Sequence, residues 1–342
     1  MAGPLVEFGI AGCAYAFGTD QDVGRTAGGY VTDPERVVRW GYRTFHRADD
    51  DVTGTALAAE AGRNALAAVG IDAADVDLVV LATSELPEYP HWDPSAALAR
   101  ELKIRERQTM LLTEGCACGV TGLGAVAGQL LLQPELDTVL FVAVNRVSEF
   151  HRNRMNVNNA VHSDGAVAAV LRRGHPRNQW LATEQLTDSD FCDWFRTDYG
   201  GSLAPVPPAG WSSRTAPSGT ERVQAHFQKD PRQLVAFNNL LNARVLEVLD
   251  RACRRAGVRR AELARFIYIN DPDGIVDLAE LIGIPLEHTN FDFAVEHAHM
   301  GAADQLSTLG NLLERGALTE GDLVALTGIS IGMRWYCTLI RI

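Results

Sequence analysis

Residues 119–131 read GVTGLGAVAGQLL, and a related stretch, GAADQLSTLGNLL, returns at 301–313. The two stretches lie 182 residues apart, and Gly128 pairs with Gly310 at the same offset. Each is followed by an apolar segment typical of a strand, DTVLFVAVN after the first and GDLVALTGISI after the second. The chain therefore contains an internal repeat, and this repeat decides the fold.

A second pair of stretches repeats the order helix, glycine, short loop and strand. NALAAVGIDAADVDLVVLATS ends at Ser84, and DRACRRAGVRRAELARFIYIND ends at Asp271. Helices that alternate with continuous apolar strands indicate parallel or mixed sheets covered by helices. We expect two similar α/β halves, 1–174 and 175–342, packed as α-β-α-β-α layers.

Composition narrows the class of partner. The formal net charge is −12, with 46% hydrophobic and 22% charged residues, as in an ordinary globular protein. An acidic surface repels phosphate backbones and anionic lipids, so neither nucleic acid nor a membrane is an expected partner. The six cysteines contain no pair of CxxC units, which predicts reduced thiols in a cytoplasmic protein rather than a zinc site or a disulfide framework.

Two segments of unusual composition each allow two structural interpretations. Residues 115–134 carry no charge and are about long enough to span a bilayer, but five Gly, two Gln and one Pro favour a buried helix. Residues 200–222 are rich in Gly, Pro and Ser and predict a long surface loop. Such a loop either shapes a binding site or is a mobile connector, and the sequence leaves both open.

Cys116 lies between an apolar stretch and the glycine-rich helix of the first repeat. A thiol at a helix N-terminus faces unpaired backbone N–H groups, which favour the thiolate and offer an oxyanion site. The 182-residue offset matches Ala117 to His299, so the second half presents a histidine close to the cysteine. The spacing predicts a nucleophile–base pair, while a helix-start histidine in a structural role stays an alternative.

The third candidate group follows the strand FIYIN. Asp271 lies beyond the end of this strand, where ligands gather in α/β sheets, and a carboxylate there could hold His299 in one tautomer. A turn-forming aspartate ahead of Pro272 is the alternative. Cys118 is expected to be a small core residue, and His297 a packing or hydrogen-bonding one. No metal is predicted, because the i, i+2 spacing of His297 and His299 is not that of a ligand set.

At these residues the sequence resembles ketoacyl-synthase III-like condensing enzymes of the thiolase superfamily. The resemblance covers nearly the whole chain and is carried by these segments: LVVLATSELPEYPHWDPSAALARELKI, EGCACGVTGL, HSDGAVAAVL, FIYIND, EHAHMGAADQ and GISIGMRWYCTLIRI. It implies a thiolase-like five-layered fold of two pseudo-symmetric halves, a homodimer, and a cysteine acylated from coenzyme A or an acyl carrier protein. It also implies an oxyanion site made by the backbone of Cys116 and of Ile331.

This sequence departs from the family pattern at two positions. Asp271 stands where members usually have His, and His299 stands where they usually have Asn. Decarboxylative condensation uses His and Asn as donors to an enolate, which an ionised aspartate would repel. An imidazole held by a carboxylate is suited instead to deprotonating an alcohol.

The sequence therefore predicts an O-acyltransferase without a tightly bound cofactor. We expect Cys116 to take an acyl group, malonyl by preference, from a coenzyme A or carrier-protein thioester. His299 would then activate a hydroxyl of a polyketide or its sugar. Similar replacements occur in condensing-enzyme homologues that tailor polyketide antibiotics. A decarboxylating starter-unit condensing enzyme and a non-catalytic partner of a true synthase are the alternatives.

Overall fold

The computed structural model describes residues 6–342, and a mixed β-sheet runs through this part of the chain. Its strand order is β5-β4-β6-β7-β1-β8-β11-β10-β9. A separate ribbon pairs β2 (Thr19–Asp22) with β3 (Thr44–Arg47). The sheet strands, in spatial order, are β5 (Gln108–Leu112), β4 (Leu78–Thr83), β6 (Thr138–Asn145), β7 (Gly165–Arg173), β1 (Phe8–Phe17), β8 (Gln179–Thr187), β11 (Arg334–Arg341), β10 (Leu323–Ser330) and β9 (Leu263–Ile267).

The sheet is continuous across its middle through one residue pair, Gly9 of β1 with Gln179 of β8. A side chain at Gly9 would overlap the carbonyl oxygen of Arg177, so only glycine allows this close approach. On one side of the joint β4 runs parallel to β5 and β6, and on the other β9 runs parallel to β10. The sheet is mixed, as predicted. The predicted boundary at residue 175 falls in the loop between β7 and β8, and as a domain limit it stays a prediction.

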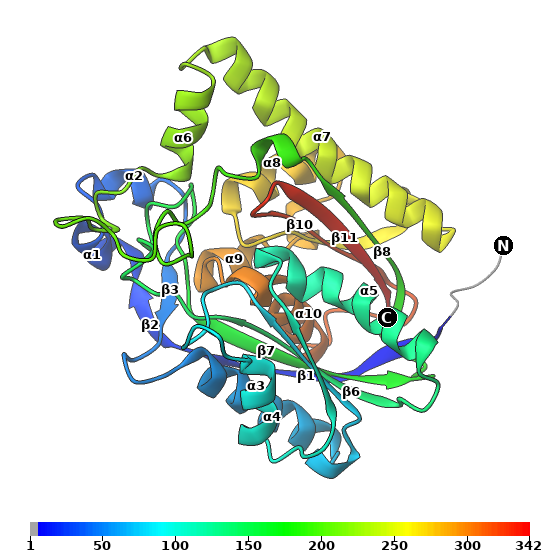
Figure 1. Cartoon of the computed structure of the whole chain (residues 1–342). Coiled ribbons are helices and arrows are strands. Elements are labelled where there is room, and N and C mark those ends of the chain that lie inside the picture. The colour runs from blue at the N-terminus through cyan, green and yellow to red at the C-terminus, as the bar shows by residue number, and fades with distance from the viewer. Residues whose placement is uncertain (1–5) are drawn as a thin grey trace.

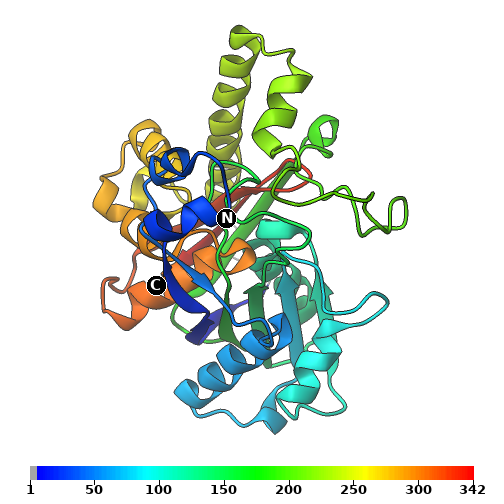
Figure 2. The ribbon, with the colours of Figure 1, turned by 90° about the vertical axis from the view of Figure 1, so that its left-hand side faces the viewer.

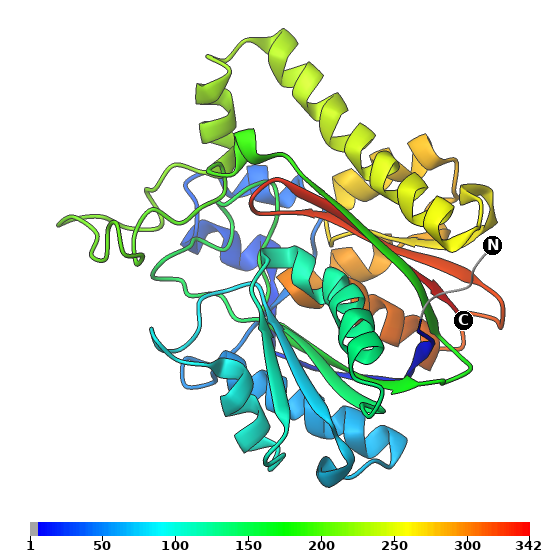
Figure 3. The same cartoon turned by 45° about the vertical axis from the view of Figure 1, so that its right-hand side comes forward.

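Helices separate and cover the two parts of the sheet. Two of them, α5 and α10, lie between the parts and contact strands of both (Figures 1 and 3). Outside, α3 and α4 cover the first part and α7 covers the second, which gives the predicted five layers. The helices are α1 (Val23–Thr26), α2 (Pro34–Val38), α3 (Gly54–Val69), α4 (Pro94–Glu101), α5 (Cys118–Leu132), α6 (Gly219–His226), α7 (Pro231–Ala256), α8 (Pro272–Ile282), α9 (Phe291–His297) and α10 (Asp304–Glu314).

The small residues of α5 let it sit in the middle layer. Gly119 packs so closely on the backbone of Ala302 that a side chain would overlap the Ala302 carbonyl oxygen. Gly122 packs in the same way on the ring of Phe141. By length and composition the segment Gly115–Leu132 could cross a membrane, but 61% of it is buried inside the protein. The predicted buried helix is confirmed.

The Gly/Pro/Ser-rich stretch is a surface loop over most of its length, as predicted. Leu203 is 99% exposed and Val206 is 76% exposed. The prediction was wrong about where the loop ends, since α6 begins at Gly219. Ser218 and Glu221 form a capping box that starts this helix, a local signal that outweighs the loop-like composition. Figure 2 shows α6 standing beside the longer α7, away from the layered body.

Candidate active site

Cys116 lies in a tight 3₁₀ turn, Gly115–Ala117, between β5 and α5. Gly115 has a φ of +62°, which a residue with a side chain would adopt only under strain, and a Cβ there would meet Ile331 and Ser330. The hydroxyl of Ser330 accepts from Ala117 N–H (3.2 Å) and donates to the Glu114 carbonyl (2.9 Å). The end of β10 therefore holds the cysteine turn in place.

The structure brings the two repeated junctions together. The second junction is another 3₁₀ turn, Gly301–Ala303, which opens α10 and packs on the cysteine turn. Cys116 Sγ lies 3.2 Å from Nε2 of His299, and the His299 side chain is 4% exposed. The predicted pairing of these two side chains is confirmed.

The carboxylate that holds His299 is Asp304. Its Oδ2 lies 2.5 Å from His299 Nδ1, and because a carboxylate only accepts, Nδ1 carries the proton and Nε2 faces the sulfur. Oδ1 accepts from Met300 N–H (2.6 Å), and Oδ2 also accepts from Asn270 N–H (2.8 Å). These bonds fix a fully buried carboxylate behind the imidazole.

The prediction that Asp271 orients His299 was therefore wrong. Asp271 precedes α8, and its carboxyl group lies against Gly274 in the first turn of that helix. Burial raises the pKa of Asp271 to about 6, while the Gly274 N–H acts in the opposite direction. The charge of His299 lowers the Asp271 pKa as well, so Asp271 borders the site without holding the base.

The electrostatics of His299 favour its charged form. Burial lowers the pKa of His299, but the Asp304 carboxylate and Cys116 outweigh burial and raise it well above 6.5. A high imidazole pKa next to a thiol favours transfer of the thiol proton to the ring. The arrangement Cys116–His299–Asp304 can therefore supply a thiolate nucleophile and then a base.

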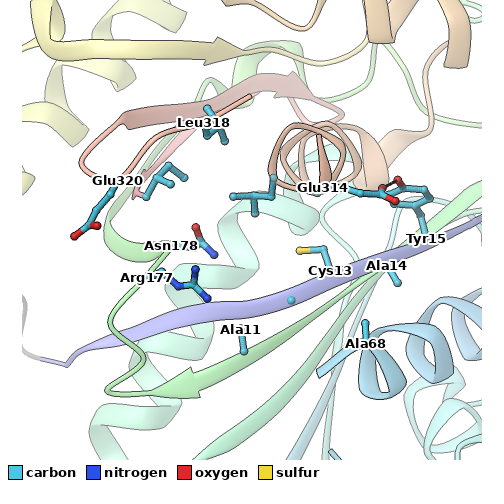
Figure 4. A pocket seen from close by; sticks show the side chains of 14 residues that line it. Ala11, Cys13, Ala14, Tyr15, Ala68, Arg177, Asn178, Glu314, Leu318 and Glu320 are labelled. Carbon is cyan, nitrogen blue, oxygen red and sulfur yellow. Dashed lines mark hydrogen bonds between the residues drawn. The ribbon is translucent and has the colours of Figure 1, made fainter. Parts of the chain in front are cut away.

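Cys118 and Cys13 have no histidine partner of this kind within residues 6–342. Cys118 is fully buried and its Sγ–H donates to the Gly115 carbonyl (2.9 Å), and burial raises its pKa. This matches its predicted place in the core. Cys13 lies on β1 at a separate cavity of about 680 Å³, with Tyr15 and Glu314 nearby (Figure 4). Burial raises the pKa of Cys13 to about 12, so it is a poor nucleophile.

His297 has the structural surroundings expected of it. Its ring stacks on Phe293 with centroids 4.0 Å apart, and its Nδ1 lies 2.8 Å from Nε2 of His46. The described residues contain no group of three or more His, Cys, Asp or Glu side chains placed to hold a metal ion. Ile331 lies against Gly115, next to the cysteine, but its predicted backbone role in an oxyanion site stays a prediction.

His162 borders His299, and an ion pair of Arg152 with Glu85 lies near these two histidines; none of these three side chains is assigned to the site by the sequence. The ring of His162 lies edge-on to that of His299, with centroids 5.1 Å apart. Arg152 donates to Glu85 in a largely buried ion pair (2.5 Å). The charge of Arg152 lowers the pKa of His162, and the charge of His299 lowers the pKa of Glu85. His162 belongs to the segment HSDGAVAAVL, which the resemblance singled out, but its polar side chain was not used as a signal.

Comparison with known proteins shows what this chain is similar to in sequence and in fold. Residues 253–342 match the model for 3-oxoacyl-[acyl-carrier-protein] synthase III, C terminal. The β-ketoacyl-[acyl-carrier-protein] synthase III of Synechocystis is 26% identical over 83% of this chain and 82% of its own. Synthase III 4 of Streptomyces coelicolor is 27% identical over 89% and 88%. The chain is therefore similar to ketoacyl synthase III enzymes over most of its length.

Solved structures show that this ketoacyl-synthase III-like chain has the thiolase-like fold. ChlB3, an acyltransferase, superposes with a TM-score of 0.84 at 21% identity, over 98% of both chains. The 3-oxoacyl-[acyl-carrier-protein] synthase III of Aquifex aeolicus gives 0.76 at 20% identity, over 98% of this chain and all of that one. At these identities the likeness concerns the fold, so the chemistry has to be argued from the site.

Proposed function

We propose that the protein is an acyltransferase that carries an acyl group on Cys116 and passes it to a hydroxyl, forming an ester. The observation that carries this proposal is the chain of contacts from Cys116 Sγ to His299 Nε2 and from His299 Nδ1 to Asp304. A nucleophile, a base and a group that orients the base are the parts that covalent acyl transfer requires.

In the first step the Cys116 thiolate attacks the carbonyl carbon of the donor thioester. The carbon–sulfur bond to coenzyme A or to a carrier protein breaks, and the leaving thiolate takes the proton from Nε2 of His299. The products are an acyl-cysteine and a free thiol, with His299 neutral. Its Nε2 is then an unprotonated base beside the new thioester, while Nδ1 stays bonded to Asp304.

In the second step His299 Nε2 takes the proton of the acceptor hydroxyl as its oxygen attacks the acyl-cysteine. The ester bond forms, the bond to Sγ breaks, and the thiolate–imidazolium pair is restored. Asp304 stabilises the positive charge on His299 at the moment when it forms, which is the function of the acid in a triad. No carbon–carbon bond is made.

The residue at position 271 supports transfer to oxygen over decarboxylative condensation. The resemblance places a hydrogen-bond donor at this position in condensing enzymes, and this chain has Asp271 there. With a pKa of about 6 its carboxyl group is mostly ionised at neutral pH, and a negative charge there opposes an enolate. Condensation is the second candidate, because the curated relatives are named as synthases.

The finer assignments belong to the same proposal. We assign malonyl as the acyl group, a hydroxyl of a polyketide or of its sugar as the acceptor, and a homodimer as the working form. The sequence resembles the ester-forming, malonyl-transferring homologue of cervimycin biosynthesis. The acyltransferase ChlB3 among the structural neighbours supports the reaction class.

The test mixes purified protein, malonyl-coenzyme A and a panel of hydroxylated polyketides and glycosides. We expect mass spectrometry to detect an ester that keeps the malonyl carboxylate, and no ester with Cys116→Ala. Release of carbon dioxide together with a β-ketoacyl product would instead establish the condensing enzyme. Cys118→Ala serves as the matched control, since Cys118 is two residues away and buried in the core.

A further inference from the structure

His162 is fixed beside the proposed base by the backbone on both sides of it. His299 N–H donates to the Val161 carbonyl (2.9 Å), and Ser163 N–H donates to the His299 carbonyl (2.8 Å). These bonds form a short parallel bridge between residues 162 and 299. The two imidazoles therefore keep their edge-on arrangement, and His162 is placed to contact whatever His299 acts upon.

The Nε2 atom of His162 is buried and has no hydrogen-bond partner among the described residues. The residue is only 4% exposed, so solvent does not readily supply the missing bond. A buried polar atom without a partner costs free energy, and proteins keep few of them. An apolar ring would fill this position without that cost, so the nitrogen indicates a ligand that completes it.

A guanidinium group, paired with a carboxylate, lies near enough to His162 for its charge to act on the imidazole. Arg152 lowers the pKa of His162, after burial, which is the largest cause. Within residues 6–342 its guanidinium donates one hydrogen bond, to Glu85 (2.5 Å), while arginine has five N–H donors in all. Glu85 follows β4 directly after Ser84, whose Oγ accepts from Ala302 N–H (3.1 Å) in the turn that opens α10. Arg152 is therefore connected, through Glu85 and Ser84, to the turn that follows His299. The side chains of His162, Arg152 and Glu85 are called the His162–Arg152 wall below.

We propose that His162 Nε2–H and the free N–H groups of Arg152 bind the carboxylate of a dicarboxylic acyl group, of which malonyl is the smallest. This inference rests on the proposed function, because it requires an acyl group on Cys116. A carboxylate offers acceptor oxygens to both donors and a negative charge to the guanidinium. An acetyl group offers neither, so the site distinguishes the two acyl groups.

The same contacts account for an acyl group that keeps its carboxylate. Loss of carbon dioxide removes the charge from the carboxylate and moves it to the carbon next to the thioester carbonyl. Donors that hold the charge on the carboxylate stabilise the ground state more than that transition state, which slows decarboxylation. The His162–Arg152 wall therefore slows loss of carbon dioxide from the malonyl group, while Asp271 disfavours the enolate that this loss would form.

The test measures loading of Cys116 without any acceptor, from malonyl-coenzyme A and acetyl-coenzyme A in parallel, by intact-protein mass. Wild-type protein should load malonyl faster. His162→Phe keeps the ring size but removes the donor, and should lower the malonyl-to-acetyl ratio about 10- to 100-fold while acetyl loading stays. His162→Gln restores an N–H donor and should recover part of the ratio. His175→Phe, in the β7–β8 loop, is the matched surface control.

Arg152 is tested together with its partner, so that no buried charge is left alone. Glu85→Gln should keep the preference for malonyl, and the double variant Arg152→Gln, Glu85→Gln should lose it. A ratio unchanged in His162→Phe, a parallel fall in both loading rates, or wild-type protein that does not prefer malonyl overturns the inference. If the preference changes as expected but no ester forms, the proposed transfer to a hydroxyl fails and the carboxylate site remains.

Discussion

The turn that carries Cys116 and the turn that follows His299 share one backbone form but differ in charge. Both are 3₁₀ turns that begin with a positive-φ glycine and lead into a central helix. The first turn of α5 contains no acidic residue, whereas α10 begins with Asp304. The repeat thus supplies two turns of similar backbone conformation. Asp304, which follows the second turn, is the acidic side chain that holds the proposed base.

The difference also shows how a helix N-terminus is used in each half. In α5 that end of the helix directly follows the turn that carries Cys116, and no charged side chain lies in its first turn. In α10 that end is next to the Asp304 carboxylate, which is itself bound to two backbone N–H groups and to His299. The second half therefore stabilises the positive charge of the proposed thiolate–imidazolium pair, which the first half completes with Cys116.

Removal of the sulfur in the first turn should have the largest effect. Cys116→Ala should abolish the acyl adduct and lower ester formation by at least about 10⁴-fold, since no other thiol contacts His299 in the described residues. Adduct formation is read by intact-protein mass. An adduct that persists in Cys116→Ala and is lost in Cys118→Ala would reassign the nucleophile.

Neutralising the acid of the second turn comes next. Asp304→Asn should slow loading of Cys116 by about 10²–10⁴-fold, because His299 loses the charge that raises its pKa and the acceptor that fixes its tautomer. The pH dependence of the loading rate should also differ from that of wild type, because the pKa of His299 falls when the Asp304 charge is removed. Asp271→Asn is the matched control and should stay within about tenfold of wild type. The reverse order of effects would restore Asp271 as the orienting residue.

The contact between the two turns is tested by glycine substitution in α5. Gly119→Ala should destabilise the protein by about 3 kcal/mol or more, because its methyl group would overlap the Ala302 carbonyl oxygen. Gly128→Ala lies in the same helix with nothing within 4 Å of the added methyl group, and should stabilise by up to about 1 kcal/mol. Urea unfolding measures both. Equal effects would show that α5 and the turn at Gly301–Ala303 are not in tight contact at Gly119.

The smallest effect concerns the charge of Asp271 and depends on pH. Its folded-state pKa of about 6 exceeds the ordinary 3.8, so the folded protein binds this proton more tightly than the unfolded chain. The resulting stabilisation is complete below about pH 4 and is lost as the pH rises through 6. Asp271→Asn should therefore raise the free energy of unfolding at pH 7, relative to its effect at pH 4, by up to about 3 kcal/mol. A pH-independent effect would contradict the burial of this carboxyl group.

Much of the fold could be predicted from the sequence because the two halves share an internal sequence repeat. The equivalent positions of Gly119 and Gly301 predict two central helices, and the same offset predicts that His299 lies close to Cys116. The uncharged run after Cys116 was correctly assigned to the core by its small residues. These features depend on periodicity and spacing, which a sequence records directly.

The identity of the third group could not be predicted in the same way. Asp304 is five residues after His299, across a turn whose compact shape brings the two side chains together. Asp271 was favoured because it follows a strand, but the direction of its side chain depends on the start of α8. An acidic residue at the start of the second central helix, five residues after His299, is the available signal. His162, Arg152 and Glu85 come from separate segments of the chain, so no local sequence pattern predicts that they lie together.

The position of β1 in the sheet has a consequence for synthesis of the protein. This N-terminal strand pairs along its whole length with β7, which ends at Arg173, and then meets β8 at Gly9. A ribosome that adds about 5–20 residues per second needs roughly 7–30 s to pass from Phe17, the end of β1, to Gly165, the start of β7. Throughout this interval β1 lacks the strand with which it pairs, so it has to stay unpaired and free of aggregation until β7 is made.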